Sequence, residues 1–243
     1  MLYPPPGTRC WTKKGMLMQA AQGIAKGDVL QRIAGIGFLV GGIASLAGNV
    51  VLRIIAAETP TERGETEPVE RIALLVLIMG FWALLVGAVG IYRSLSTGTA
   101  AVWARLGFYG ILGGTTLATV SLAIDLAASS AAAFWVAAGA ITGTSEYAVA
   151  VSLNVIANSV FDVTIVGYWL ALLALGIGMV LSDTYPRWLG WALLVLSAVV
   201  VAVSVPRLFI GSNPTLDIVF AIPAGLTSIW ALVLGVWVTR KAW

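Results

Sequence analysis

NVIANSVFDVTIVGYWLALLALGIGMVLS, residues 154–182, is the stretch of sequence that decides the fold. Its last ~20 residues form an apolar run, and about 20 helical residues at 1.5 Å each cross a hydrocarbon layer roughly 30 Å thick. The stretch therefore predicts a membrane-spanning helix, and the surrounding chain repeats the pattern. We expect an all-α, polytopic transmembrane helix bundle.

Two interpretations of the start of this span remain open. If the helix begins early, Asn154, Asn158 and Asp162 share one face at successive i, i+4 spacings, which indicates a polar site leading into the membrane. If the helix begins at Ser159, then Ser159 and Asp162 form a capping box, in which the two side chains bind backbone N–H groups at the helix start. We favour the second interpretation, which gives these residues a structural role only.

The composition places the whole chain in a lipid bilayer. Of its 243 residues, 59% are hydrophobic and only 10% are charged, whereas soluble domains carry about 25% charged residues. We interpret the net charge of +3 as a sign of membrane topology and not as a nucleic-acid-binding surface. We therefore expect a multi-pass protein of the cell inner (plasma) membrane, with membrane lipids and other membrane protein subunits as its partners.

The residues that metal and cofactor chemistry needs are scarce. The chain has no histidine, which removes the commonest ligand of zinc, copper and haem iron, and also imidazole catalysis. Cys10 is the only cysteine, and no lysine lies in an apolar span where retinal could form a Schiff base. We predict no metal site, no catalytic residue and no cofactor, while a bound lipid or apolar pigment is compatible with the composition.

The amino-terminal residues predict a cytoplasmic arm over 1–28, followed by a six-helix transmembrane domain over 29–243. A cleavable signal peptide is excluded because the prolines and lysines at the start precede only a broken apolar stretch. We expect the first span at Ile33–Ala56, with Asp28 capping it. Gly37 and Gly41 on this span form a G-x-x-x-G face, which favours close packing of another helix of the same chain.

Five further spans are expected over residues 72–92, 104–128, 159–182, 188–210 and 215–238. Glu58–Arg71 contains five glutamates and two prolines, and it predicts an acidic solvated loop. Asn213 and Pro214 predict the start of the last span, because proline is favoured at the first helical position. One face of the third span carries a stripe of small residues that ends in an acid: Gly107, Gly110, Gly114, Ala118, Ser121 and Asp125.

The Ala-rich segment after the third span leaves a count of six or seven spans open. With six spans and a cytoplasmic N-terminus, ten of the 14 lysines and arginines lie on the cytoplasmic side, whereas seven spans leave eight there. The positive-inside tendency favours the first count. We therefore predict six spans with both termini cytoplasmic, and Ala131–Val151 as a helix or hairpin on the outer surface.

This topology brings the charged residues near the span ends to one side of the membrane: Arg53, Asp125, Asp162, Arg207 and Asp217. A charge at the bilayer centre costs about 2.5–3.5 kcal/mol, so such groups pair or face water. One interpretation is a small outer-facing polar cavity roofed by Ala131–Val151. The other, which we favour, places each charge at a helix end that suits its sign. Asp125 alone has the wrong sign for its end, and pairing with Arg53 or Arg207 is the expectation most worth testing.

Three stretches of the chain carry a resemblance to a known family: Arg32-Ile-Ala-Gly35 through Ala47-Gly-Asn49, Tyr185-Pro-Arg-Trp-Leu-Gly190, and Trp230 to Lys241. They resemble a family of bacterial six-helix membrane proteins that is catalogued only as a domain of unknown function. The resemblance implies the fold and no activity. Thr227 and Ser228 stand where such proteins often place a glutamate in the last span, so no shared intramembrane acid is implied.

These features favour a non-catalytic integral membrane subunit or scaffold that packs within a larger membrane protein assembly. Its packing surfaces would be the small-residue faces: Gly37, Gly41, Gly107, Gly110 and Gly114. The alternative hypothesis is a small-solute transporter or channel with an outer-facing polar cavity. A membrane enzyme acting on lipid is a third hypothesis.

Overall fold

The computed structural model describes the backbone of residues 13–55, 59–210 and 214–241, and within these ranges all side chains except those of residues 13–28, 214, 215 and 217. In this part the chain forms α-helices joined by short connections: α1 (Lys13–Ile54), α2 (Pro60–Ser94), α3 (Gly98–Ala137), α4 (Ser145–Val180), α5 (Arg187–Ile210) and α6 (Pro214–Lys241). Each is long and apolar enough to cross a membrane. The prediction of an all-α, six-span integral membrane protein is confirmed, while the orientation of its termini stays a prediction.

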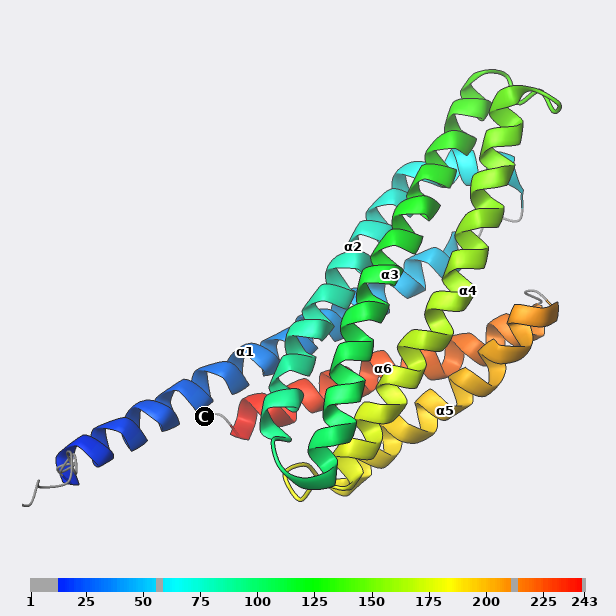
Figure 1. Cartoon of the computed structure of the whole chain (residues 1–243). Helices are drawn as coiled ribbons and strands as arrows, with labels where there is room; N and C mark the ends of the chain where they lie inside the picture. Colours follow the sequence, from blue (N-terminus) through cyan, green and yellow to red (C-terminus); the bar gives the residue numbers. More distant parts are fainter. Residues whose placement is uncertain (1–12, 56–58, 211–213, 242–243) are drawn as a thin grey trace, which may run out of the picture.

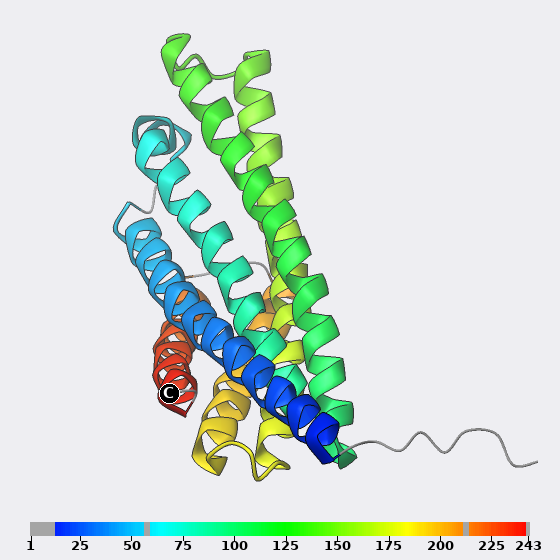
Figure 2. The same cartoon turned by 90° about the vertical axis from the view of Figure 1, so that its left-hand side faces the viewer.

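The helices follow one another around a ring (Figures 1 and 2). Each helix packs against the next one in the chain, and α6 closes the ring by packing against α1. Short connections explain this order, because consecutive elements joined by a few residues have to be neighbours in space. In Figure 1, α5 and α6 cross the steeper pair of α3 and α4 at a clear angle. The ring places one face of most helices toward a shared interior.

The first helix is longer than the expected span. Its backbone is helical without a break from Lys13 to Ile54, so the helix does not begin at Asp28 as we expected. The residues before Asp28 include leucine, methionine, glutamine, alanine and lysine, all good helix formers, which offset the glycines among them. Figure 1 shows the amino-terminal end of α1, in dark blue, extending past the ends of the other helices. Residues 1–12 of the predicted arm lie outside the described residues.

The predicted acidic loop at Glu58–Arg71 is wrong, because α2 already begins at Pro60. Thr59 and Glu62 form a capping box in which each side chain binds the backbone N–H of the other residue, and Pro60 occupies the first turn, where proline is tolerated. Glu67 and Arg71 form an ion pair one turn apart on the same helix. Most of the residues that suggested a solvated loop therefore lie on a helix, and four of them form ion pairs: Arg63 with Glu70, and Arg71 with Glu67.

The segment Ala131–Val151 is a hairpin, one of its two predicted forms, but it continues the neighbouring spans. Its first part is the end of α3 and its last part is the start of α4. Gly139 and Gly143 make the turn at φ 99° and 87°, and the Trp135 indole donates to the Ile141 carbonyl at 2.9 Å. Figure 1 shows α3 and α4, in green, extending together beyond the other helices. Forty residues make α3 roughly 60 Å long, about twice the hydrocarbon thickness.

The early start of the fourth span is the correct alternative. α4 begins at Ser145 with Thr144 as its N-cap, so the capping box that we favoured at Ser159 is wrong. Ser159 lies inside the helix, and its hydroxyl donates to the carbonyl of Val155. Asn154, Asn158 and Asp162 therefore lie on continuous helix at the i, i+4 spacing of a polar face.

The predicted small-residue faces lie at contacts between helices of this chain. A Cβ atom built at Gly37 or Gly41 would lie within 2.9 Å of backbone atoms of α2. Three glycines of α3 lie in the same way against Leu175, Ala171 and Tyr168 of α4: Gly107, Gly110 and Gly114. These close approaches hold α1 to α2 and α3 to α4, as expected where apolar burial gives helices little reason to associate.

Candidate functional site

The interior of the ring contains a cavity of about 250 Å³, which we call the central cavity. Five of the helices line it: α1, α2, α3, α4 and α6. Aromatic side chains form much of its wall: Phe38, Phe81, Phe161, Tyr168, Trp169, Phe220 and Trp230. The lining residues of α4 extend from Ala157 to Leu175, roughly 27 Å along the helix axis, so the cavity is elongated.

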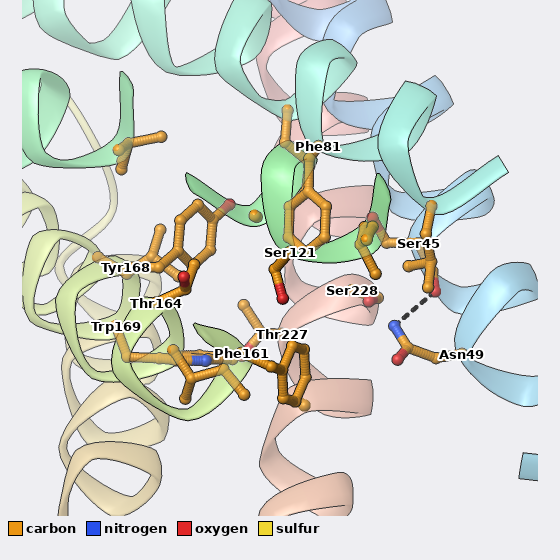
Figure 3. A pocket seen from close by; sticks show the side chains of 18 of the residues that line it. Ser45, Asn49, Phe81, Ser121, Phe161, Thr164, Tyr168, Trp169, Thr227 and Ser228 are labelled. Carbon is orange, nitrogen blue, oxygen red and sulfur yellow. Dashed lines mark hydrogen bonds between the residues drawn. The ribbon is translucent and has the colours of Figure 1, made fainter. Parts of the chain in front are cut away.

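Polar side chains from four helices interrupt this apolar wall: Ser45, Asn49, Ser121, Asp125, Asn158, Thr164, Thr227 and Ser228. Figure 3 shows Ser121 near the middle, with Thr164 and Tyr168 on one side and Ser45, Asn49 and Ser228 on the other. The Asn49 amide donates to the Ser45 carbonyl at 2.7 Å. A mostly apolar cavity with a few convergent polar groups is typical of a small-molecule site.

The stripe of small residues on α3 serves two purposes. Its glycines pack against α4, while its continuation through Ala118, Ser121 and Asp125 lines the central cavity. The sequence predicted a single stripe of small residues that ends in an acid, with only its glycines assigned to helix packing. The residue types distinguish the two parts, because the stripe changes from glycine to serine and aspartate. Burying a hydroxyl or carboxylate group between helices is unfavourable unless the group has a hydrogen-bond partner or faces a cavity.

A second cavity of about 230 Å³, the distal cavity, follows the central cavity along the same helices. On α1 it is lined by Gln31, Ala34 and Phe38, whereas the central cavity begins at Phe38 and continues to Leu52. On α6 the same order holds, with the central cavity ending at Ala231 and the distal cavity lined by residues from 237 to 241. The two cavities therefore lie one after the other through the bundle.

Phe38 stands between the two cavities and lines both of them. Its ring lies so close to Gly87 of α2 that a Cβ atom there would be 2.7 Å from it. Trp230 of α6 meets it edge-on with the ring centroids 6.2 Å apart, and the Trp230 indole donates to the Leu189 carbonyl at 2.9 Å. This buried aromatic pair lies at the boundary between the cavities, with Phe38 in the lining of both.

A cluster of ion pairs lies where the central cavity reaches Asp125, and Arg63 is its centre. The Arg63 guanidinium donates to Glu70 at 2.6 Å, to the carboxylate of Asp125, and to the side-chain carbonyl of Asn154. Ser129 donates to the second oxygen of Glu70 at 2.8 Å. The cluster joins α2, α3 and α4, and its Arg63 and Glu70 side chains are only 14% and 10% exposed.

The described ion-pair partner of Asp125 is Arg63, rather than the predicted Arg53 or Arg207. We had assigned Arg63 to a loop, and only the helical start of α2 brings it against α3. Arg53 lies in the last turn of α1 with an exposed side chain. The side chain of Asp217 lies outside the described residues.

Asp162 and Arg207 of the predicted polar cluster do meet. They form an ion pair between α4 and α5 at 3.1 Å, with side chains 16% and 11% exposed. The Arg207 guanidinium also lies over the ring of Phe220, 5.6 Å from its centroid, and Phe220 contacts Phe161 edge-on. Because both phenylalanines line the central cavity, this ion pair supports its wall from outside.

Of the predicted charges, Asp125 lies in one ion-pair site, and Asp162 and Arg207 lie in another. Both aspartates lie inside long helices, so the interpretation of them as helix-end charges is wrong. Among the residues that the structure describes, no group of three histidine, cysteine, aspartate or glutamate side chains is placed to hold a metal ion. Comparisons with protein-family models, curated proteins and solved structures gave no match. The fold and the site define a six-helix integral membrane protein with two consecutive interior cavities.

Proposed function

We propose that this protein carries a small amphipathic solute across the membrane by way of its two cavities. The observation that carries the proposal is their alignment on either side of Phe38. On α1, the lining residues run from Gln31 to Leu52, roughly 32 Å of helix, which matches the hydrocarbon thickness. A solute passing between the cavities would cross most of the bilayer inside the protein.

The volume of the central cavity supports a ligand site rather than a packing defect. Protein interiors contain few voids larger than a water molecule, and an apolar cavity of about 150 Å³ already holds a benzene molecule. At about 250 Å³, the central cavity has room for an aromatic ring and a short chain. Its convergent hydroxyl and amide groups supply hydrogen bonds that a purely structural void would not need.

The barrier at Phe38 favours a carrier over an open pore. Phe38 is 3% exposed and Trp230, which packs against it, is 6% exposed, so a solute would have to displace a well-packed pair to pass this level. Transporters commonly bind substrate near the bilayer midplane and admit it to one side at a time. Rotation or displacement of the aromatic pair would connect the two cavities.

Flux into liposomes tests the proposal. Three membrane-impermeant aromatic solutes of different charge serve as probes: benzyltrimethylammonium, benzenesulfonate and phenyl glucoside. We expect protein-dependent uptake of at least one probe. Because tryptophan is larger than phenylalanine and would further obstruct the passage between the cavities, Phe38→Trp should lower that uptake. Phe38→Ala should join the cavities and raise it.

Phe134→Ala is the matched control, because Phe134 is 65% exposed at the far end of α3 and lines neither cavity. Liposomes that contain Phe134→Ala should take up the same probe to the same extent as liposomes that contain the unmodified protein. No uptake of any probe above protein-free liposomes, or equal uptake by Phe38→Trp and the unmodified protein, would contradict the proposed function.

A second candidate is a subunit or scaffold of a larger membrane protein assembly. The observation that favours it is the amino-terminal end of α1, which extends past the other helices (Figure 1) and so offers helix for a partner to bind. Purification in mild detergent should then recover a stoichiometric partner, and deletion of residues 1–28 should lose it. A monodisperse monomer that the deletion leaves unchanged would count against this candidate.

A further inference from the structure

The charge of the central cavity is negative. Among the described residues that line it, Asp125 is the only one with a charged side chain. The Arg63 guanidinium that binds Asp125 also binds Glu70, so two carboxylates share one cation. The formal charge of these three groups is −1, and this charge lies at the end of the cavity that Asp125 lines.

The surroundings of Asp125 increase this negative charge. Residues 60–71 of α2, which pack against α3 here, carry three further glutamates and one further arginine: Glu62, Glu65, Glu67 and Arg71. Arg71 is itself paired with Glu67. A cation approaching this end of the cavity would be attracted, and an anion would be repelled, because a group of like charges creates a field that extends beyond its contacts.

The aromatic wall suits the same kind of ligand. A cation within about 6 Å of the face of a tryptophan, tyrosine or phenylalanine ring is attracted by the ring's electron density. Phe161, Tyr168 and Trp169 on α4 all line the cavity. Arg207 already uses Phe220 in this way from outside the cavity. The wall can therefore hold both the hydrocarbon and the charged part of an organic cation.

We infer that the central cavity binds a small aromatic organic cation, a protonated or quaternary amine, with its charged group toward Asp125 and its ring among the α4 aromatics. The inference rests on the proposed function and names the class of its substrate. Asp125 would act as the counter-ion of the bound amine, while the hydroxyls of Ser121 and Thr164 lie further along the same cavity. The volume of about 250 Å³ suits a ring with a short chain.

Equilibrium dialysis of the full-length protein in mild detergent tests this inference. The probes are benzyltrimethylammonium as the cation, benzenesulfonate as the anion and benzyl alcohol as the neutral compound. We expect the unmodified protein to bind the cation at least tenfold more tightly than the anion. This comparison needs no variant, so it decides the question even if a substitution prevents folding. Equal or tighter binding of the anion would overturn the inference.

Variants then test whether Asp125 is the group that attracts the bound cation. Asp125→Asn should weaken binding of benzyltrimethylammonium at least tenfold and leave benzyl alcohol binding unchanged, while Asp125→Glu should retain cation binding. Asp183→Asn is the matched control, because Asp183 is 97% exposed in the connection between α4 and α5 and lines neither cavity. Unchanged cation affinity in a folded Asp125→Asn protein would overturn the role of Asp125.

The two proposals fail in different ways. If phenyl glucoside or benzenesulfonate crosses liposomes in a Phe38-dependent way and the cation neither binds nor crosses, the proposed function stands and the cation inference falls. If none of the probes binds or crosses, both fall. If the unmodified protein takes up benzyltrimethylammonium, and Asp125→Asn and Phe38→Trp each reduce that uptake, both proposals are supported.

Discussion

Arg63 is the residue at which three helices meet. Its guanidinium binds groups of α2, α3 and α4, and its partners Asp125 and Asn154 lie 62 and 91 residues further along the chain. Sequence reasoning correctly placed Asp162 and Arg207 in one cluster but gave Asp125 the wrong partner. The spacing of residues along one helix indicates which side chains share a face, whereas the partner on another helix depends on the angle at which the helices cross.

Removing the Arg63 cation should destabilise the protein. Arg63→Met leaves the carboxylates of Glu70 and Asp125 close together without their shared partner, and breaking a buried ion pair is strongly destabilising. Because Asp125 is partly exposed, we expect a loss of about 2 kcal/mol, less than for a fully buried pair. Unfolding of the variant and of the unmodified protein in mixed micelles measures the difference in their free energies of unfolding.

Arg187→Met is the control for that substitution. Arg187 pairs with Asp183 at 3.6 Å, the two side chains are 76% and 97% exposed, and exposed pairs of this kind contribute about 1 kcal/mol or less. Adding Glu70→Gln and Asp125→Asn to Arg63→Met should recover much of the lost stability, since the uncompensated charges are removed. Equal losses for Arg63→Met and Arg187→Met would show that the cluster contributes no more than a surface pair.

At the scale of helices, the sequence predicted the apolar interiors well and some of the ends poorly. The start of α5 at Arg187 and of α6 at Pro214 each lie within one residue of the expected start, because proline and the tryptophans mark those boundaries. The starts of α2 and α4 lie 12 and 14 residues before the expected ones. Both helices extend beyond the apolar run, so hydropathy alone does not show where they begin.

The close packing of α3 on α4 predicts a difference between two glycines of the same helix. A Cβ atom at Gly107 would lie 2.8 Å from the backbone nitrogen of Leu175, whereas one at Gly113 would meet nothing within 4 Å. Gly107→Leu should therefore cost about 2–3 kcal/mol through overpacking. Gly113→Leu should be neutral or stabilising by about 0.5–1 kcal/mol, because glycine is unfavourable inside a helix.

Thermal unfolding of both variants in the same detergent measures this difference. The Gly107→Leu protein should unfold at a lower temperature than the unmodified protein, and the Gly113→Leu protein should not. If both substitutions lower the unfolding temperature equally, the glycine stripe of α3 is not a contact with α4 and the arrangement of the ring is wrong at that seam.

At the scale of the whole molecule, six crossings require both termini to lie on the same side of the membrane. We predict that this side is the cytoplasm and that the turn between α3 and α4 is outside. In a Cys10→Ser background, a membrane-impermeant maleimide should label Thr142→Cys in intact cells. It should label Arg240→Cys only after permeabilisation.

The alternative labelling patterns are equally informative. Reversed labelling would mean that the bundle is inverted, and the Asp125 end of the central cavity would then lie on the cytoplasmic side. Labelling of both positions from the same side would contradict the passage of α4, α5 and α6 as three separate crossings. The charge distribution that supports the prediction is visible in the sequence, but the depth of each helix in the bilayer depends on packing.

The closing of the ring by α6 on α1 has a consequence for how the protein is made. As the chain leaves the ribosome, each new helix can dock on the helix inserted just before it, but the first helix must wait for the last. Until then the face of α1 that carries Gly35 and Gly42, both of which contact α6, has no neighbour. Since α6 also lines both cavities, neither compartment exists before α6 has been made and inserted.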